Sequence, residues 1–269
     1  MSEATTLGLT GRVALVTGVS RRVGIGFALA RRLLDDGATV MVSGWQPHDA
    51  GMPWGADPGG PTAVLAALGT GRPISQVDVD LEQPDGPDTL VAAAVERFGA
   101  IDIVVANHAR SSSHDLDDVT VDELDRCWAA NTRASVLLAK ALSRHHDDRR
   151  PGGRLVLFTS GQHLEPMAGE LAYAVSKGAI HQMTPALADH LADRGITVNC
   201  INPGPVDTGY ANAVDRERVA SMFPAKRWGS PDDVARLVAW LVSDEAAWVT
   251  GQVINSEGGF RRRSLPAPR

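Results

Sequence analysis

Cysteines and long apolar runs are scarce in this chain. Its 269 residues include only Cys127 and Cys200, and neither has a partner at a spacing typical of metal ligands. This scarcity argues against a disulfide framework and against a structural zinc. No apolar run approaches the roughly 20 residues of a membrane span, and the N-terminus lacks a signal-peptide layout. We therefore expect a cytoplasmic protein with no metal site and no membrane attachment.

Positive charge is also in short supply. Lys and Arg total 26 against 32 for Asp and Glu, so the formal net charge is −6. Such a balance argues against a general attraction to nucleic acid or to anionic membranes. Hydrophobic residues make up 43% of the chain, which is ordinary for a globular protein. Because no repeat or long linker divides the sequence, we expect residues 1–269 to form a single domain.

Short apolar segments alternate with helical patterns almost from end to end. Strands are predicted at residues 12–16, 39–42, 101–106, 154–158, 196–201 and 252–254, and helices at 26–36, 87–98, 121–145, 171–194 and 231–243. Continuous apolar strands are typical of a parallel sheet that is covered on both faces. The alternation therefore predicts an α/β fold, a Rossmann-type doubly wound parallel sheet in a three-layer αβα arrangement.

Two regions interrupt this alternation. Residues 46–61 are rich in Gly and Pro and contain Trp54, which predicts a long irregular loop. Residues 207–229 carry a helical pattern at 210–222 that is expected to be weakly tied to the core. The tail at 264–269 is expected to be frayed.

Tyr173 and Lys177 are the most informative pair of residues in the chain. They lie four residues apart in the predicted helix 171–194, so both side chains project from one helix face. A tyrosine has a reference pKa of about 10. A neighbouring cation lowers that pKa toward the range in which the phenol transfers protons at neutral pH. The pair indicates acid–base catalysis if a reacting oxygen reaches Tyr173, whereas in isolation it is more often a solvated surface pair.

A glycine-rich turn follows the first predicted strand and precedes the first predicted helix. It runs Thr17-Gly18-Val19-Ser20-Arg21-Arg22-Val23-Gly24-Ile25-Gly26. In an open α/β sheet, a dinucleotide pyrophosphate lies here against the helix N-terminus, and glycines let the backbone approach it. The position of the turn therefore predicts dinucleotide binding, with an ordinary tight turn as the alternative.

With these motifs, the chain resembles the short-chain dehydrogenase/reductase family in its single-domain, 3-oxoacyl-carrier-protein-reductase-like form. The resemblance covers nearly the whole chain. The usual turn of that family reads T-G-x3-G-x-G, whereas this one reads T-G-x5-G-I-G, so two residues are inserted in the phosphate loop. The implied cofactor contacts are Gly18, Ser20, Arg21, Arg22, Gly24, Ile25, Gly26, Trp45, Asp78, Val79, Asn107, Lys177, Pro203, Gly204, Val206 and Thr208.

The resemblance implies particular roles for some of these contacts. Asp78 reaches the adenine amine, and Thr208 with the backbone of segment 203–208 contacts the nicotinamide carboxamide. Residues 106–109 read A-N-H-A where the family shows N-N-A-G, so Asn107 is kept and His108 stands at a normally small position. We interpret His108 as a packed or solvated side chain rather than a nicotinamide contact.

NADP(H) is favoured over NAD(H) as the cofactor. NAD-preferring relatives carry an acidic residue at the end of the second strand, whereas residues 42–45 include none. Arg21 and Arg22 are predicted to pair with a 2′-phosphate, and Trp45 to lie over the adenine. The alternative for both arginines is simple exposure to water.

The resemblance also implies a catalytic tetrad of Asn131, Ser160, Tyr173 and Lys177. Ser160 binds the substrate carbonyl, Tyr173 transfers the proton, and Lys177 holds the nicotinamide ribose while lowering the tyrosine pKa. Asn131 orders a water that joins the lysine to solvent. Taken singly, Ser160 is compatible with a turn and Asn131 with a polar helix position, but their order and spacing match the family.

The predicted function is an NADP(H)-dependent oxidoreductase that interconverts a carbonyl and an alcohol, with a 3-oxoacyl compound or a small ketone or aldehyde as substrate. The N-terminal half is expected to hold the cofactor, with residues 46–61 on the adenosine side. Residues 131–228 are expected to supply the catalytic groups and the substrate pocket, for which the candidate lining residues are His163, Met167, Tyr210 and Met222.

Two other function classes fit the same residues. One is a dehydratase- or epimerase-like enzyme on this scaffold, and the other is a cofactor-binding sensor or scaffold without turnover. Relatives pair the helices that correspond to 121–145 and 171–194, which predicts a homodimer or homotetramer.

Overall fold

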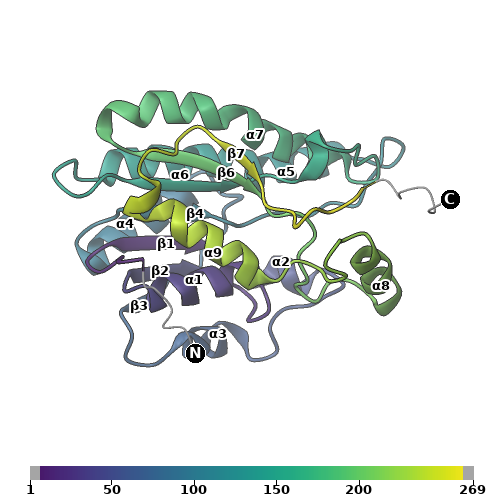
Figure 1. Ribbon diagram of the computed structural model, residues 1–269, viewed down its shortest axis with the longest axis horizontal. Helices are drawn as coiled ribbons and strands as arrows, with labels where there is room; N and C mark the ends of the chain where they lie inside the picture. The colour runs from purple at the N-terminus through teal and green to yellow at the C-terminus, as the bar shows by residue number, and fades with distance from the viewer. Residues whose placement is uncertain (1–6, 263–269) are drawn as a thin grey trace.

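Seven parallel strands form one central sheet in the computed structural model, which describes residues 7–262 (Figure 1). The strand order is β3-β2-β1-β4-β5-β6-β7. Strands β2 and β3 lie on one side of β1 and strands β4 to β7 lie on its other side, so the strand order switches between β1 and β4. The strands are β1 (Val13–Thr17), β2 (Thr39–Ser43), β3 (Ile74–Gln76), β4 (Ile103–Ala106), β5 (Arg154–Phe158), β6 (Thr197–Asn202) and β7 (Val253–Asn255). This order confirms the doubly wound arrangement.

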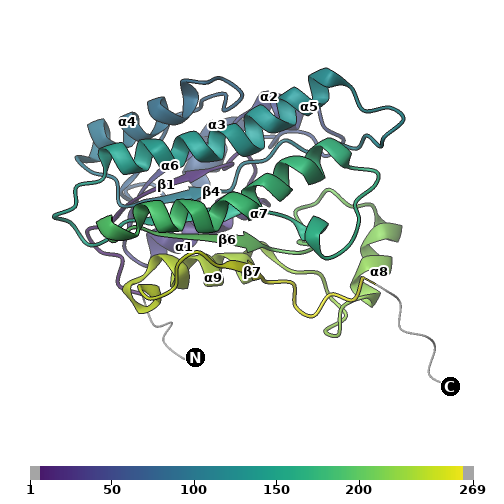
Figure 2. The same ribbon diagram turned by 90° about the horizontal axis from the view of Figure 1, so that it is seen from above.

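Helices cover both faces of the sheet, which confirms the three-layer prediction (Figures 1 and 2). One face packs against α1 (Ile25–Asp35), α3 (Gly60–Leu68) and α9 (Pro231–Val242). The other packs against α4 (Gly86–Phe98), α6 (Ala134–His145) and α7 (Leu171–Leu191). The remaining helical segments are α2 (Gln46–Ala50), α5 (Val121–Cys127), α8 (Ala213–Ser221) and the short turns Trp128–Arg133, Gly161–His163, Ala192–Arg194 and Asp244–Ala246.

Strand β1 shows how the apolar side chains divide between the two layers. Ala14 and Val16 belong to the core beneath α1 and α9, whereas Val13 and Leu15 belong to the core beneath α4 and α6. Successive side chains of a strand point to opposite faces, so a strand buried on both faces must be apolar throughout. This is why the strands read as continuous apolar runs in the sequence.

The region 46–61 is more ordered than the sequence predicted. It begins with the helix α2, in which Pro47 lies in the first turn, and it ends where α3 starts at Gly60. Proline is compatible with the first turn of a helix because the amide hydrogen that it lacks has no partner there. Strand β3 was also absent from the predicted strands, because its three residues lie at the sheet edge and are only half-buried.

The predicted helix 121–145 is interrupted at its centre. A π-helical turn, Trp128–Arg133, separates α5 from α6 and carries Asn131. Such turns cost hydrogen-bond geometry and are frequent at functional sites. The helical pattern predicted at 210–222 forms the shorter helix α8, whose start is capped by the Asn212 side chain and which buries none of its residues. The tail 264–269, expected to be frayed, lies outside the described residues.

The described helices, which lie between residues 7 and 262, include none that combines the length and the apolar character needed to cross a membrane.

Asp102 is a buried carboxylate that ties the start of the sheet together. It accepts the Val13 amide at 2.8 Å and two hydrogen bonds from Arg150, both at 2.7 Å. Burial raises its pKa, but the hydrogen bonds from Arg150 and Val13 outweigh burial, so the pKa of Asp102 is lowered overall. A buried carboxylate with this many donors stabilises the fold only while it is ionised.

Asp102→Asn should lower the free energy of unfolding at pH 7 by about 1–3 kcal/mol, because it removes the charged acceptor of Arg150. Urea unfolding of the wild type and the variant measures this difference. Asp147→Asn is the matched control, since Asp147 pairs with Arg149 on the surface and should matter much less.

The Asp102 contribution should also depend on pH. Because the folded-state pKa is lowered, the contribution is complete above the unfolded value of about 4 and is lost as pH falls through the folded pKa. The difference in the free energy of unfolding between the wild type and Asp102→Asn should therefore become smaller in acid. A difference that stayed constant in acid would contradict the claim that Asp102 stabilises the fold as an ionised carboxylate.

Candidate active site

A cleft of about 670 Å³ opens at the carboxyl ends of the strands, where the strand order switches between β1 and β4. Open α/β sheets bind ligands at this topological switch point. The described lining comes from the glycine-rich turn, the ends of β2, β4, β5 and β6, the start of α7 and the segment that follows β6. Its volume falls within the usual range for small-molecule and cofactor sites.

Gly18 and Gly26 allow three backbone segments to meet at the base of this cleft. Gly18 has a φ of +73°, and a Cβ there would lie 2.8 Å from the Asn107 side chain. A Cβ on Gly26 would lie 2.2 Å from the Gly18 carbonyl oxygen. A side chain at Gly18 would push away the end of β4, and a side chain at Gly26 would push α1 away from the end of β1.

The N-terminus of α1 lies at the cleft and has no capping side chain. Gly24 stands at the cap position without a side-chain hydrogen bond, and the first turn contains no acidic residue. The first amide groups of a helix have no partner within the helix and carry partial positive charge. The arrangement therefore fits an anionic diphosphate at Gly24 and Ile25, both of which line the cleft.

The two arginines of the turn lie in different surroundings. Arg22 is bound to Asp57: its guanidinium donates at 2.8 to 3.1 Å, and its backbone amide also donates to that carboxylate at 3.0 Å. These contacts lower the pKa of Asp57 to about 2. Arg21 lines the cleft, and the structure of residues 7–262 shows no ion pair for it. The guanidinium of Arg22 is thus already engaged, whereas that of Arg21 is available to a ligand.

The predicted adenine contacts lie at the ends of β2 and β3. Trp45 and Val79 line the cleft, and the Trp45 side chain is exposed. Asp78 lies beside the cleft, where its carboxylate accepts the Gly44 amide at 3.0 Å and the Gln76 side chain. Asp78 therefore holds the end of β2 in place as well as standing where the adenine contact is predicted.

Asn107 and His108 connect the end of β4 to its neighbours. The Asn107 amide donates to the carbonyls of Thr17 at 3.1 Å and Gly18 at 3.3 Å. His108 Nε2 lies 2.9 Å from the Ala130 carbonyl, which can only accept, so Nε2 carries the hydrogen. Nδ1 therefore accepts, and the Thr17 hydroxyl donates to it at 2.7 Å. His108 is held by these contacts and also lines the cleft.

Asn131 lies behind the cleft wall rather than on it. Its side chain accepts the Arg110 amide at 2.7 Å and donates to the Arg110 carbonyl at 3.0 Å and to the Ser176 hydroxyl at 2.9 Å. These contacts clamp the segment after β4 to the π-helical turn and to α7. The water-ordering role of Asn131 stays a prediction, and its amide side chain is occupied by the clamp.

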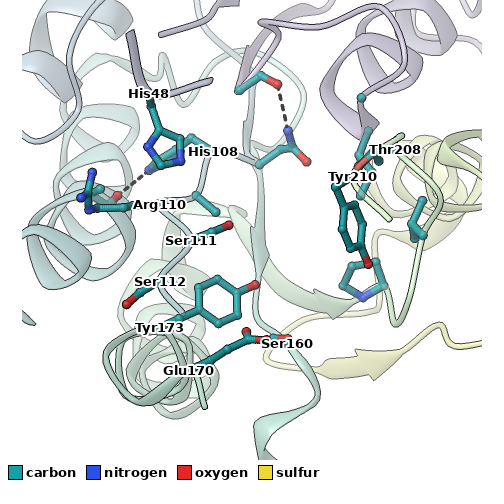
Figure 3. A pocket seen from close by; sticks show the side chains of 18 of the residues that line it. His48, His108, Arg110, Ser111, Ser112, Ser160, Glu170, Tyr173, Thr208 and Tyr210 are labelled. Carbon is teal, nitrogen blue, oxygen red and sulfur yellow. Dashed lines mark hydrogen bonds between the residues drawn. The ribbon is translucent and has the colours of Figure 1, made fainter. Parts of the chain in front are cut away.

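Ser160 and Tyr173 face the cleft together (Figure 3). Ser160 follows the end of β5, and Tyr173 stands in the first turn of α7. Lys177, one turn further along α7, is buried behind them and donates from Nζ to the Phe158 carbonyl at 2.9 Å. The Lys177 ammonium lies 5.8 Å from the centre of the Tyr173 ring. The three residues predicted to act together are therefore neighbours.

The expected lowering of the tyrosine pKa is absent in this state. Burial raises the pKa of Tyr173 to about 12, although the nearby Ser160 hydroxyl opposes the rise. Burial also lowers the pKa of Lys177 to about 8. The Lys177 ammonium is turned toward the Phe158 carbonyl, so desolvation rather than the cation dominates at the phenol. A lysine with this pKa exchanges protons readily near neutral pH.

The segment after β6 forms the opposite wall. Pro203, Gly204, Val206 and Thr208 all line the cleft. Gly204 has a φ of +63°, which suits glycine, and its amide donates to the Asn202 side chain at 3.1 Å. Val206 pairs with Gly229 in a short parallel bridge, which closes the base of the 207–229 excursion.

Segment 46–61 extends further than the adenosine side to which it was assigned. Trp54 lines the cleft and contacts the Tyr210 ring edge to face, with centroids 6.4 Å apart. Tyr210 in turn packs on Trp228 at 5.8 Å. Of the four substrate candidates, Met167 and Tyr210 line the cleft, whereas His163 and Met222 do not.

Other lining residues have no motif in the sequence. They include His48, Arg110, Glu165, Glu170, Phe260 and Arg262. Arg262 is bound to Glu257, with one contact of 2.7 Å, and Arg110 is bound to Glu82 and Glu123. Only their tertiary positions reveal them, although the spacing of Glu170 three residues before Tyr173 offered a weak signal.

Comparison with known proteins adds independent information. The model of a family described as Enoyl-(Acyl carrier protein) reductase matches residues 18–261. The chain is 36% identical to an uncharacterized oxidoreductase, YjdA, of Bacillus subtilis, over 93% of this chain and 97% of that protein. It is 34% identical to the versicolorin reductase stcU of Emericella nidulans, over 97% of this chain and 100% of that protein.

A solved structure with a similar fold contains a bound dinucleotide. It is that of a blue fluorescent protein from a metagenomic library in complex with NADPH, which superposes with a TM-score of 0.83 at 32% identity. The match covers 94% of this chain and 99% of that one. The similarity therefore extends over the sheet, the cleft and the surrounding helices.

His108 should contribute a measurable pH dependence to stability. Burial, and next the charge of Lys177, lowers the pKa of His108 to about 3. The unfolded chain binds a proton at this residue below about pH 6.5, so stability falls as pH drops from that value toward the folded pKa. His108→Gln should remove this component and make the fall in unfolding free energy shallower, by up to about 1 kcal/mol per pH unit.

Urea unfolding at a series of pH values between neutrality and mild acid measures that slope. His190→Gln is the matched control, because His190 is exposed near the end of α7 and should leave the slope as in the wild type. An unchanged slope in His108→Gln would show that His108 is protonated in the folded protein.

Proposed function

The chain belongs to the short-chain dehydrogenase/reductase family, and on this premise we propose that it is an NADP(H)-dependent oxidoreductase that interconverts a carbonyl and an alcohol. The observation that carries the proposal is the convergence of Ser160, Tyr173 and Lys177 on a cleft that begins at a glycine-rich turn. The family is one of oxidoreductases, and relatives that resemble the whole chain are named oxidoreductases or reductases.

The glycine-rich turn and the uncapped start of α1 fit the diphosphate of a dinucleotide. A Cβ on Gly18 or Gly26 would fill the space in which the backbone segments meet, and the amide groups near Gly24 are the donors for an anion. In the proposed enzyme, Asn107 and segment 203–208 flank the nicotinamide end. The bound cofactor supplies the hydride, and the protein supplies position and protons.

Ser160 and Tyr173 hold the reacting oxygen of the substrate. The Ser160 hydroxyl donates to the carbonyl oxygen, and the Tyr173 phenol donates the proton that turns the developing alkoxide into an alcohol. A phenol with a pKa raised to about 12 is protonated at neutral pH, so it carries the proton that reduction consumes. In the oxidative direction, Tyr173 must accept the proton, which needs a stabilised phenolate.

Lys177 replaces the proton on Tyr173 or stabilises the phenolate. Its pKa of about 8 allows it to give up a proton without a large free-energy cost. In the proposed complex, its ammonium leaves the Phe158 carbonyl and contacts the ribose next to Tyr173. The cation then lowers the tyrosine pKa, as the sequence predicted for the working enzyme.

NADP(H) is the proposed cofactor rather than NAD(H). The end of β2, Ser43-Gly44-Trp45, carries no carboxylate for the ribose hydroxyls, while Arg21 lines the cleft. The complex of a similar fold with NADPH supports this choice. From the sequence, Arg21 and Arg22 were equal candidates for the 2′-phosphate. The contact between Arg22 and Asp57 favours Arg21 as the partner.

The proposed substrate is a small-molecule ketone or aldehyde, or a 3-oxoacyl compound. Met167 and Tyr210 line the substrate end of the cleft, and Trp54 and Phe260 add aromatic surface there. The name of one relative, a versicolorin reductase, is consistent with a reductase activity.

The proposed assembly is a homodimer or homotetramer. Large apolar side chains are exposed along α5, the π-helical turn, α6 and α7, and they are Val121, Leu124, Trp128, Val136 and Val175. A monomer rarely leaves so many apolar side chains together in water, so a second copy is the expected partner.

Tyr173→Phe should lower kcat for ketone reduction by about 10²–10⁴-fold, since it removes the proton donor and changes no other atom. The dissociation constant of NADPH should stay close to that of the wild type. Tyr210→Phe is the matched control, because these two residues are the only tyrosines of the chain. It should reduce turnover much less, and near-normal turnover of Tyr173→Phe would refute the proton role.

Arg21→Gln should weaken NADPH binding by about tenfold and leave NADH binding almost unchanged, because it removes a charged donor to the 2′-phosphate. Arg22→Gln should have a smaller effect, since its guanidinium is held by Asp57. Fluorescence titrations of both dinucleotides with the wild type and the two variants measure these affinities. Equal or tighter NADH binding by the wild type would remove the NADP(H) assignment.

A further inference from the structure

Glu170 places a carboxyl group beside the proposed catalytic residues. It immediately precedes α7 and lines the cleft with Ser160 and Tyr173. Figure 3 shows its side chain extending from the start of α7 toward Ser160. Its charge also acts on both tyrosines of the cleft, since it contributes to the raised pKa values of Tyr173 and Tyr210 after the larger effect of burial. Glu170 therefore faces the space in which the substrate carbonyl must lie.

The carboxyl group has no partner within residues 7–262. Glu170 occupies the cap position of α7, yet its side chain makes no capping hydrogen bond to the helix amides. Its backbone is engaged, because its amide donates to the Met167 carbonyl and its carbonyl accepts the Ala174 amide. The side chain is thus turned away from its own helix, where a carboxylate would be stabilised, and toward the cleft.

Neighbouring cations do not compensate Glu170. Arg262 is bound to Glu257, and Arg110 is bound to Glu82 and Glu123. The Lys177 ammonium is held at the Phe158 carbonyl. Burial alone raises the pKa of Glu170, which is the sign of a carboxyl group that loses water without gaining a donor.

Glu170 is half-buried in the cleft lining, so its carboxyl can accept a hydrogen bond from a donor on a bound ligand. The walls of the same cleft carry aromatic side chains, with Trp54 and Tyr210 in contact at a centroid distance of 6.4 Å and Phe260 also in the lining. Such walls favour a flat ring system. A negatively charged substrate group at this place would be repelled, whereas a hydroxyl group would satisfy the carboxyl.

We propose that Glu170 is a specificity-determining residue that accepts a hydrogen bond from a hydroxyl group on a ring-bearing ketone substrate. The substrate class is therefore hydroxylated cyclic or aromatic ketones, in preference to ketones that carry a carboxylate near the reacting carbonyl. This inference rests on the proposed reductase function, because Ser160 and Tyr173 define where the carbonyl lies.

Matched ring ketones test the inference. The probes are hydroxy-1-tetralones, the corresponding methyl ethers and the corresponding carboxylates, assayed for NADPH oxidation with the wild type and with Glu170→Gln. The wild type should prefer the best hydroxy compound over its methyl ether by about 10- to 100-fold in kcat/KM. Glu170→Gln should lose most of that ratio and should also discriminate less against the carboxylate. A general structural defect would instead slow all three probes together.

Glu245→Gln is the control variant, because Glu245 is exposed in the short turn after α9 and lies far from the cleft lining. Glu245→Gln should keep the wild-type preference in kcat/KM for the hydroxy compound over both the methyl ether and the carboxylate. Calorimetric binding of the hydroxy compound and its methyl ether to the NADP⁺-loaded protein provides a second readout that needs no turnover. The affinity ratio there should follow the kinetic one and fall in Glu170→Gln.

The outcomes separate the two proposals. Turnover by the wild type with equal kcat/KM for the hydroxy compound and its ether would overturn the Glu170 inference and leave the reductase proposal standing. A ratio unchanged in Glu170→Gln would do the same. Absence of turnover for every ketone, with NADPH bound, would overturn the proposed function, and the calorimetric ratio would then decide the role of Glu170 by itself.

Discussion

The contact between the ends of β1 and β4 is the constraint on which the rest of the site depends. Because Gly18 and Gly26 lack side chains, Asn107 can reach two carbonyl groups at the end of β1. His108 continues the connection from Thr17 to the Ala130 carbonyl in the π-helical turn. The glycine-rich turn, the end of β4 and the π-helical turn are therefore joined by hydrogen bonds among groups that are largely withdrawn from water, where such bonds resist competition.

A second set of contacts links the phosphate loop to the covering segments. The expanded loop carries Arg22, whose bond to Asp57 anchors segment 46–61 beside the turn. From that anchor, the segment reaches across to Tyr210, where Trp54 meets the excursion that follows β6. One ion pair and one aromatic contact thus join three parts of the chain that are distant in sequence. The same ion pair changes the chemistry of the loop, because it withdraws one of two adjacent arginines from ligand binding.

Burial sets the protonation states around the reacting position. It raises the pKa of the Tyr173 phenol to about 12 and lowers the pKa of the Lys177 ammonium to about 8, so the two pKa values move in opposite directions from those of the free side chains. It also leaves Glu170 as an acceptor without a donor. A water-poor cleft makes each of these groups more sensitive to a ligand than it would be on the surface.

The sequence alone determined the fold class and the order of the motifs that carry the family resemblance. Apolar strands and helical periods depend on local pattern, and Tyr173 and Lys177 share a helix, so their proximity follows from spacing. The tertiary structure decided everything that depends on side chains distant in sequence: the loss of Arg22 to Asp57, the clamp of Asn131 on Arg110, and the reach of Trp54 to Tyr210. It also decided the pKa of Tyr173, because desolvation depends on how much of the whole molecule surrounds the phenol, and no local pattern records that.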